Sequence, residues 1–471
     1  MQHKPAIWWI RRDLRLADNP TLMRAIQRGR PVIPVYVLDE REEALGAAAS
    51  LRLMLGLKTL AKTLESKGSY LIFRRGDALA QLRAVAQHSG ADTVCAARAF
   101  EPADIQRDTR VTDGLRGDGI QMDWGPGNLL FDPLGVQTGA GQYYRVYTPY
   151  WRAVRGLEVP DPVAAPGKIS SPEAVPPSDS IDAWHMDAAM NRGAAILTQH
   201  CMVGEESALD RLHFFTEEKI AAYAADRDFP AVDATSGLSE NLAWGEISPI
   251  RLWHAGQRAM AQGRPGAETF LKEVVWREFA YHLAANTPQI MTGNWRDKWD
   301  SFPWSTEEDE QVLAWKQGRT GVDLVDAAMR ELYVTGRMHN RLRMLTASFL
   351  TKHMMKHWKI GLDWFADCLI DWDPASNAMG WQWVAGSGPD AAPFFRIFSP
   401  LRQQERFDPK SAYVTRWLAE GQRTPSAQAL AFFEACPRSW DIRPNDLRPL
   451  PILDLKAARQ RALDAYSQNS Q

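Results

Sequence analysis

Cysteine is scarce in this sequence: four residues occur among 471, and no two of them have a CxxC spacing. This scarcity excludes a disulfide framework, and it leaves no local cysteine set for a zinc or iron–sulfur site. We therefore expect free thiols, most of them buried, and no bound metal.

Long apolar runs are also absent. No stretch of roughly 18 apolar residues occurs, so no transmembrane helix is predicted. The first apolar run ends at Arg11 and Arg12, which excludes a signal-peptide core. We expect a cytoplasmic protein without a membrane partner, and we expect a monomer because nothing in the sequence demands a protein partner.

The sequence also lacks an excess of charge of either sign. Lys and Arg number 55 against 57 Asp and Glu, which gives a formal net charge of −2. Global electrostatics therefore do not favour nucleic acid, and any DNA binding must come from a local basic patch. Tryptophan, by contrast, is abundant: there are 19, several beside charged or Asn residues.

Residues 1–130 alternate short β-rich runs with helical stretches. Asn19 followed by Pro20 is typical of a helix start, and apolar residues at helical spacing predict a helix over 51–64. Strands alternating with helices indicate an α/β domain with a doubly wound parallel sheet, which binds ligands beyond the carboxyl ends of its strands. The predicted strands are 6–10, 31–37, 69–73, 93–97 and 120–124.

Two further regions follow this domain. Residues 131–204 are rich in Gly, Pro, Ser and Asp and are predicted to form a long interdomain linker. Residues 205–471 have an almost wholly helical pattern, which predicts a second, all-α domain. A chain of 471 residues suits such a division.

A basic segment, residues 335–360, contains no acidic residue. Arg337, Arg341, Lys352 and Lys356 recur in it at spacings that keep them near one another on a helical face. A charge run of this kind is usually a solvated helix face. Interleaved with His, Asn and Met, it would also suit a phosphate backbone.

Residues 371–383 combine two carboxylates, an Asn and two tryptophans, which is not the pattern of an amphipathic helix. No His or Cys accompanies the carboxylates, so a ligand amine or ribose is as reasonable a partner as a metal, and a structural polar network is the alternative. Arg341 and Arg343 are candidate counter-charges that would allow Asp371 to be buried.

Two shorter motifs carry polar groups. The TSGLS segment (residues 235–239) offers hydroxyls and closely approached backbone amides, which suit either a phosphate or a helix cap. Glu273 and Trp276 stand three residues apart, on one face of a predicted helix.

Six motifs resemble, in order and spacing, those of the photolyase/cryptochrome family, and in particular its class I cyclobutane pyrimidine dimer (CPD) photolyases. The match covers nearly the whole chain. The motifs are WWIRRDLRLADNP (8–20), TSGLS (235–239), EVVWREF (273–279), GRTGVDLVDAAMRELYVTGRMHNRLRM (318–344), NAMGWQW (377–383) and DAAPFFRIFSP (390–400).

The resemblance implies that the helical domain holds FAD in a bent conformation. Asn377 matches the side chain that faces the reactive edge of the flavin, where it would tune the cofactor. By motif position, the other residues implied to contact FAD are Tyr223, Thr235, Ser236, Gly237, Leu238, Ser239, Arg277, Arg343, Asp371, Trp372 and Asp373.

The resemblance also implies a pocket for a dimer flipped out of DNA. Relatives that act on (6-4) photoproducts carry His at the positions of Asn340 and Met344, so this sequence favours the cyclobutane dimer. The implied catalytic residues are Glu273, Trp276, Asn340, Met344, Asn377 and Trp383. The implied DNA contacts are Arg227, Glu273, Trp276, Arg341, Trp383 and Arg396, and the implied electron-transfer residues are Trp304, Trp358 and Trp381.

Departures from the family pattern concern the chromophores. Ala378-Met379 replaces a more usual Asn-Gly beside the flavin, and Ala103-Asp104 stands where folate-binding members have Asn-Glu. The antenna is therefore left open between a reduced folate, a deazaflavin, another flavin, or none.

The function implied is light-dependent repair of CPDs in UV-damaged DNA, a carbon–carbon lyase reaction driven by an electron from excited, reduced FAD. One rival is a cryptochrome, a blue-light receptor of the same fold. The retained lesion pocket and the lack of a long C-terminal extension disfavour it. The other rival, a non-catalytic DNA-binding module, leaves the paired Asp residues and the TSGLS segment without a role.

Overall fold

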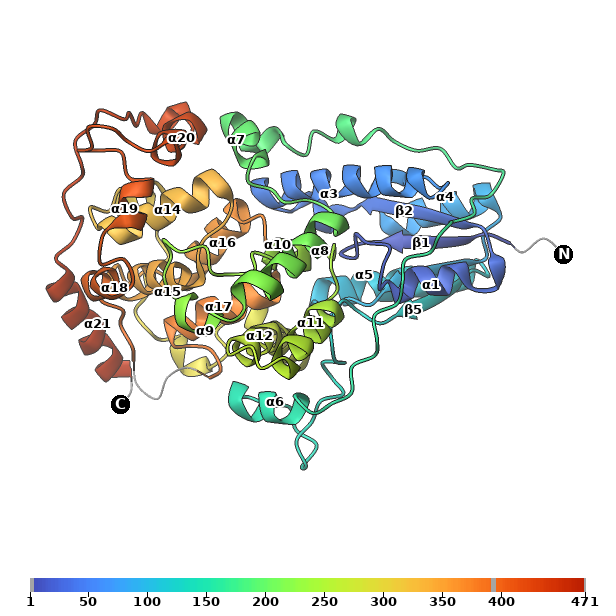
Figure 1. Ribbon diagram of the computed structural model, residues 1–471, viewed down its shortest axis with the longest axis horizontal. Coiled ribbons are helices and arrows are strands. Elements are labelled where there is room, and N and C mark those ends of the chain that lie inside the picture. The colour runs from blue at the N-terminus through green and yellow to red at the C-terminus, as the bar shows by residue number, and fades with distance from the viewer. Residues whose placement is uncertain (1–3, 391–394, 470–471) are drawn as a thin grey trace.

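The computed structural model describes residues 4–390 and 395–469, so residues 391–394 of the DAAPFFRIFSP motif lie outside the described part. Its N-terminal part is built on one five-stranded parallel sheet with strand order β3-β2-β1-β4-β5 (Figure 1). The strands are β1 Ala6–Ile10, β2 Val32–Leu38, β3 Ile72–Arg75, β4 Thr93–Ala97 and β5 Gln121–Gly125. This is the parallel α/β domain that the sequence predicted.

Helices cover both faces of the sheet, so successive residues of a strand pack in opposite directions. Trp8 and Ile10 share a core with helices α1 and α3, whereas Ile7 and Trp9 share another with α4 and α5. A parallel sheet buried on both faces needs such unbroken apolar strands. The helices are α1 Pro20–Ile26, α2 Glu40–Glu43, α3 Ala47–Ser66, α4 Ala78–Ser89 and α5 Pro102–Gly117.

Local capping explains where α1 begins. The Asn19 side chain accepts a hydrogen bond from the backbone N–H of Leu22 at 3.0 Å, and Pro20 opens the first turn. The predicted helix over 51–64 lies inside α3. Both sequence predictions are confirmed.

Residues 131–204 run along both parts of the molecule. Helix α6 (Tyr147–Val154) buries Tyr150 and Trp151 in a core shared with helices α11 and α12. Farther along, Ile181 and Trp184 pack into the core beneath α3, and α7 (Ala194–Thr198) follows. Figure 1 shows the later part of the segment passing over α3. The segment is thus packed against its neighbours over much of its length.

The remainder of the chain is helical, as the sequence predicted. Beyond β5, the described residues contain one isolated β-bridge, between Ser305 and Lys356, and no further named strand. The helices are α8 Glu205–Phe214, α9 Tyr223–Asp226, α10 Ser239–Ala243, α11 Pro249–Ala261, α12 Ala267–Asn286, α13 Glu310–Lys316, α14 Asp323–Thr335, α15 Asn340–Ser348, α16 Trp358–Cys368, α17 Pro374–Ala385, α18 Pro400–Phe407, α19 Ala412–Trp417, α20 Ala427–Ala435 and α21 Leu455–Asn469.

Helix α17 joins the two cores of this helical part. Ala375, near its beginning, belongs to the core built on α6, α8, α11 and α12. Trp381 and Val384, near its end, belong to the core built on α13 to α17 and α19 to α21. Side chains along α17 therefore lie where the two cores meet.

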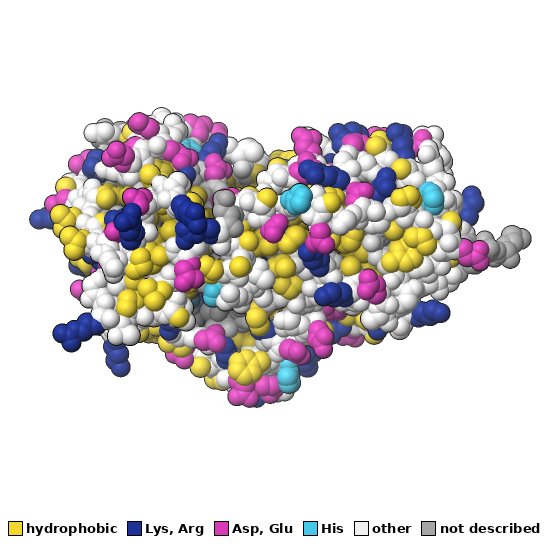
Figure 2. All heavy atoms as spheres, turned by 90° about the horizontal axis from the view of Figure 1, so that it is seen from above, with side chains coloured by type: hydrophobic (Ala, Val, Ile, Leu, Met, Phe, Trp, Pro, Cys, Tyr) yellow, Lys and Arg dark blue, Asp and Glu magenta, His cyan; other side chains and the backbone are white. Residues whose placement is uncertain are grey.

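The surface agrees with the near-zero net charge. On the face seen in Figure 2, basic and acidic side chains are intermixed, and no large patch of one sign is visible. Among residues 4–390 and 395–469, no helix is long and apolar enough to cross a membrane. The four cysteines are free, and three of them are buried.

Candidate functional site

Helix α17 carries three of the predicted site residues, Asn377, Trp381 and Trp383. Its beginning is fixed by Asp373, whose Oδ1 accepts a hydrogen bond from the Ser376 backbone N–H at 2.8 Å. The helix packs against α12, α15 and α16. Those helices bear eight of the other predicted residues, from Glu273 on α12 to Trp358 on α16, so elements far apart in the sequence converge on α17.

The buried Asp371 carboxylate has one arginine partner. Arg343 Nη2 donates to its two oxygens at 3.0 and 2.8 Å. Arg341, the other expected counter-charge, instead pairs with Asp228 at 2.6 Å. Positions two apart on a helix point to nearly opposite sides, so only one of the two arginines can reach Asp371. The expectation is confirmed for Arg343 and wrong for Arg341.

Asp373 connects α12 to α17. Its Oδ2 accepts a hydrogen bond from the Tyr281 hydroxyl at 3.0 Å and lies 3.6 Å from Arg277 Nε. Burial raises the pKa of Tyr281 well above its usual value, so the phenol keeps the proton it donates. Asn377 Nδ2 donates to the Asp373 carbonyl at 2.9 Å, which fixes the orientation of that amide.

Arg277 retains an unused donor. Its Nη1 donates to the Asn128 carbonyl at 2.9 Å, but its buried Nε makes no hydrogen bond to any described residue. A buried N–H without an acceptor is costly, and an oxygen of a bound ligand would satisfy it.

The TSGLS segment leads into α10. Gly237 adopts a φ of +62°, which a glycine reaches without strain, and its carbonyl accepts a hydrogen bond from Arg211. Leu238 is buried, whereas Thr235 and Ser239 are exposed with their hydroxyls available. Tyr223, on α9, is buried against Phe215 and Phe270.

These groups suit a dinucleotide cofactor such as FAD. Hydroxyl groups and the backbone of a tight glycine turn can bind a diphosphate. An unused guanidinium N–H can donate a hydrogen bond to a ligand oxygen. The two carboxylates can accept hydrogen bonds from ribose hydroxyls or the adenine amine. Trp372, between the two carboxylates, receives a hydrogen bond on its carbonyl from Arg12 at 3.0 Å. Among the described residues, no cluster of His, Cys, Asp and Glu could hold a metal ion.

The predicted lesion-pocket residues of α12 already have partners. The Trp276 ring stacks on Tyr147 of α6, with centroids 3.7 Å apart and planes 5° from parallel. Glu273 forms an ion pair with Arg227, which the sequence had assigned to a DNA phosphate. Sequence reasoning missed Tyr147, although the five aromatic residues within 143–151 were an available signal that this segment packs against other parts of the chain.

The remaining pocket residues lie on α17 and α15. Trp383 is half-buried, donates its Nε1 hydrogen to the Asp390 carbonyl at 2.9 Å and lines a small cavity of about 40 Å³ together with Lys352 and Arg396. Met344 is half-buried on α15, and Asn340, at the first position of that helix, is exposed. Trp276 packs against the core that contains α11 and α12, and Trp383 packs against the core that contains Trp381.

The four cations singled out in the basic segment have partners within the chain. Arg337 pairs with Glu240, and Lys356 pairs with Asp309 at 2.7 Å. Lys352 is buried and donates to the Arg396 carbonyl. Chain beyond the segment supplies each partner, so the absence of local acidic residues was misleading. The DNA assignment of Arg341 meets the same difficulty, since Asp228 already pairs with it.

Burial of Lys352 has a testable consequence. Burial, with a smaller contribution from Arg396, lowers the pKa of Lys352 from 10.5 to about 7. Between these values the unfolded chain binds the additional proton, so this lysine makes the free energy of unfolding rise with pH. We expect Lys352→Met to flatten that rise, measured by urea unfolding from pH 7 to pH 9. Parallel curves for Lys352→Met and wild type would contradict this, and Lys359→Met, at an exposed site, is the control.

The three tryptophans assigned to electron transfer are buried. Trp381 packs on α16 at Gly361, one turn after Trp358. The His357 ring lies 5.5 Å from that of Trp358 and 5.4 Å from that of Trp304, centroid to centroid. The His357 ring therefore links Trp358 to Trp304, and Trp381 packs on the helix that Trp358 begins.

A second polar cluster lies at the carboxyl ends of β1 and β2, and of its residues sequence reasoning had named only Asp104. Buried atoms of Tyr36, Glu42 and Arg11 have no hydrogen-bond partner among the described residues. Asp104, noted in the sequence, lies there too, 3.2 Å from Arg107. Burial raises the pKa of Glu42 well above its usual value, which favours the neutral acid. The strand-end rule for doubly wound sheets was the available signal.

Fold and site together define an α/β domain joined to a helical domain whose side chains suit a nucleotide cofactor. Residues 6–167 match the family model for DNA photolyase, and residues 270–468 match that for the FAD binding domain of DNA photolyase. The chain therefore belongs to the DNA photolyase family, and its C-terminal half is an FAD-binding domain of that family.

Similar proteins carry the same description. The deoxyribodipyrimidine photo-lyase of Agrobacterium fabrum is 42% identical over 470 residues, which cover 98% of each chain. The crystal structure of a bacterial class III photolyase from Agrobacterium tumefaciens has 40% identity and a TM-score of 0.89, over 100% of this chain and 98% of that one. An archaeal photolyase from Sulfolobus tokodaii, solved with two FAD molecules, has 27% identity and a TM-score of 0.80, over 98% and 100%. The chain is an enzyme of this family.

Proposed function

We propose that this protein repairs cyclobutane pyrimidine dimers in UV-damaged DNA, using light. Excited, reduced FAD supplies an electron to the dimer, both inter-pyrimidine bonds break, and the electron returns, so there is no net redox change. The observation that carries the proposal is the convergence on α17, which brings Asn377 and Trp383 to a helix packed on the one that holds Glu273 and Trp276.

The side chains have distinct roles in this proposal. Trp276 and Trp383 stack on the flipped-out dimer, and stacking of roughly 1–3 kcal/mol per base offsets part of the few kcal/mol that flipping costs. Glu273 exchanges its Arg227 partner for the pyrimidine edge. Asn340 and Met344 border the dimer, and Asn377 holds its amide toward the flavin.

The subclass is the narrower part of the proposal. The sequence motifs resemble those of class I CPD photolyases, but a structure described as a class III photolyase is 40% identical over the full chain. That similarity supports class III membership. Both assignments give the same reaction, and the same assay tests it.

Illumination of a defined substrate tests the function. The purified protein, with its flavin reduced, is mixed with an oligonucleotide that contains one thymine dimer, and absorbance at the thymine band is followed. We expect it to recover in blue light and not in darkness. Bound flavin without recovery in light would instead support a light sensor, and a colourless protein that binds DNA would support a simple binding module.

Trp276→Ala separates lesion recognition from general DNA binding. We expect binding to dimer-containing DNA to weaken about tenfold to a hundredfold, in line with the loss of one or two stacked bases. Binding to undamaged DNA should change by less than about threefold. Titration of both oligonucleotides by fluorescence anisotropy measures the two effects.

The matched control is Trp440→Ala. Trp440 is also half-buried, but it packs against Tyr333, at a centroid distance of 4.9 Å, away from α17. Equal losses on damaged and undamaged DNA for Trp276→Ala, or equal losses for both variants, would refute the pocket role.

We also propose that the polar cluster at the carboxyl ends of β1 and β2 holds a second, light-gathering chromophore. Its unsatisfied buried groups on Tyr36, Glu42 and Arg11 support a ligand there. The archaeal relative with two FAD molecules supports a flavin, and reduced folate and deazaflavin fit the same role. Extraction and absorption spectra of the purified protein identify the compound.

A further inference from the structure

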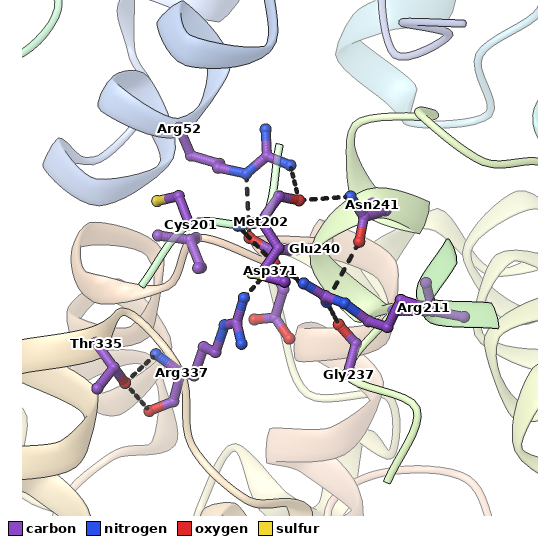
Figure 3. Close-up of polar contacts among 12 residues, drawn as sticks. Arg52, Cys201, Met202, Arg211, Gly237, Glu240, Asn241, Thr335, Arg337 and Asp371 are labelled. Atoms are coloured by element: carbon purple, nitrogen blue, oxygen red, sulfur yellow. Dashed lines mark hydrogen bonds and ion pairs between the residues drawn. The ribbon is translucent and has the colours of Figure 1, made fainter. Parts of the chain in front are cut away.

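A buried cluster of ion pairs joins the α/β domain to the beginning of α10. Glu240 is at its centre, and Arg52, Arg211 and Arg337 surround it (Figure 3). We call these four residues the Glu240 cluster. Arg52 comes from α3 and is fully buried, with its Nε 3.1 Å from Glu240 Oε2.

The three arginines reach Glu240 from three separate elements. Arg211, on α8, donates from Nη1 to Glu240 Oε1 at 3.3 Å and also to the Gly237 carbonyl in the TSGLS segment. Arg337 follows α14 and pairs with the same carboxylate oxygen. Because Glu240 immediately follows Ser239, these contacts fix the end of the segment that offers its hydroxyls.

The cluster carries more positive than negative charge. Glu246 is the second partner of Arg52, with Nη1 donating to its Oε1 at 2.9 Å, and Asp371 is the partner of Arg343. Around Glu240 and Glu246, three guanidinium groups thus face two carboxylates. The surplus cation has no carboxylate of its own, and the anion of a ligand would supply one.

The exposed fractions assign different parts to the arginines. The Arg52 side chain is 0% exposed and that of Arg211 is 12% exposed, so neither can turn to meet a ligand freely. The Arg337 side chain is 36% exposed. It is therefore the guanidinium best placed to exchange part of its contact with Glu240 for an arriving anion.

We propose that the Glu240 cluster sets the TSGLS segment for the diphosphate of FAD. Arg337 contacts the diphosphate, and Arg52 acts as a positioning residue that reaches across from the α/β domain. The inference rests on the proposed function, because it takes FAD as the ligand. On this proposal, retention of FAD depends on a contact between the two domains. A local binding motif within the helical domain would not need that contact.

Release of FAD from the holoprotein tests the proposal. We compare wild type with Arg52→Met, Arg52→Lys and Arg337→Gln, and follow the rise in flavin fluorescence as FAD leaves. Arg330→Met is the matched control, because Arg330 forms an equally buried pair with Glu420 elsewhere in the helical domain. Each protein is then reconstituted with FAD or with riboflavin, which lacks the diphosphate.

We expect Arg52→Met and Arg337→Gln to release FAD at least tenfold faster than wild type, and Arg52→Lys to recover part of the loss. In Arg52→Met and Arg337→Gln, the affinity for riboflavin should change by less than threefold. Arg330→Met should keep the wild-type ratio of FAD affinity to riboflavin affinity. The proposal is overturned if both flavins weaken equally, or if Arg330→Met behaves like Arg52→Met. If Arg52→Met does not fold, Arg337→Gln, at a partly exposed position, tests the proposal through its ratio of FAD affinity to riboflavin affinity. A wild-type protein that binds no FAD would instead overturn the proposed function.

Discussion

Gly361→Ala is expected to slow light-driven reduction of the flavin severalfold and to lower the free energy of unfolding by about 1–3 kcal/mol. A Cβ at this position would lie 2.0 Å from the Trp381 ring, and that ring is only 3% exposed, so it has no free space to enter. Trp381 must move away from α16, and thereby from Trp358, the next aromatic residue of the proposed path. Flash photolysis measures the electron step, and urea unfolding measures stability.

Gly380→Ala is the matched control, since Gly380 lies on α17 beside Trp381. A Cβ there would meet nothing within 4 Å. Alanine is favoured over glycine inside a helix, so we expect this variant to gain about 0.5–1 kcal/mol and to keep wild-type photoreduction. If Gly361→Ala photoreduces like Gly380→Ala, Trp381 is not part of the electron path.

Arg330→Met is expected to cost about 3–5 kcal/mol of unfolding free energy, the largest effect on stability that we predict. Arg330 donates to the two Glu420 oxygens at 2.7 and 2.6 Å, and both side chains are fully buried. Loss of the arginine leaves a buried carboxylate without its partner, which costs far more than the pair contributes. Denaturant unfolding at neutral pH measures the loss.

An exposed pair supplies the comparison. Arg116 lies 3.1 Å from Asp113, and both side chains are largely in solvent. Pairs of this kind contribute little, so Arg116→Met should change stability by less than about 1 kcal/mol. Similar losses for Arg116→Met and Arg330→Met would show that burial does not control the value of these ion pairs.

The sheet could be predicted from the sequence because a buried parallel strand is an unbroken apolar run. The bounds of β1 and β4 coincide with the prediction. β3 begins at residue 72 rather than 69, because its ladder with β2 starts only where Ile72 faces Val35. Pairing with the neighbouring strand decides where β3 begins, so the composition of β3 alone does not predict that boundary.

The convergence of site elements followed from motif order, but the partners of the charges did not. Arg52 and Glu240 are 188 positions apart, and Arg343 could be told from Arg341 only once helix direction was known. Four cations of the basic segment, Arg337, Arg341, Lys352 and Lys356, looked alike in the sequence, yet each has its own distant partner. Ion pairing depends on which segments meet, and that is decided by packing of the apolar cores.

Helix α17 contributes residues to both hydrophobic cores of the helical part. Trp381 and Trp383 are two positions apart on it and so point to nearly opposite sides. A rotation of α17 about its axis that turned Trp383 toward a lesion of another shape would also move Trp381 away from α16. In the proposed mechanism, lesion choice and electron supply are therefore coupled through α17, and a new substrate preference is expected to arise from side chains on α12 and α15.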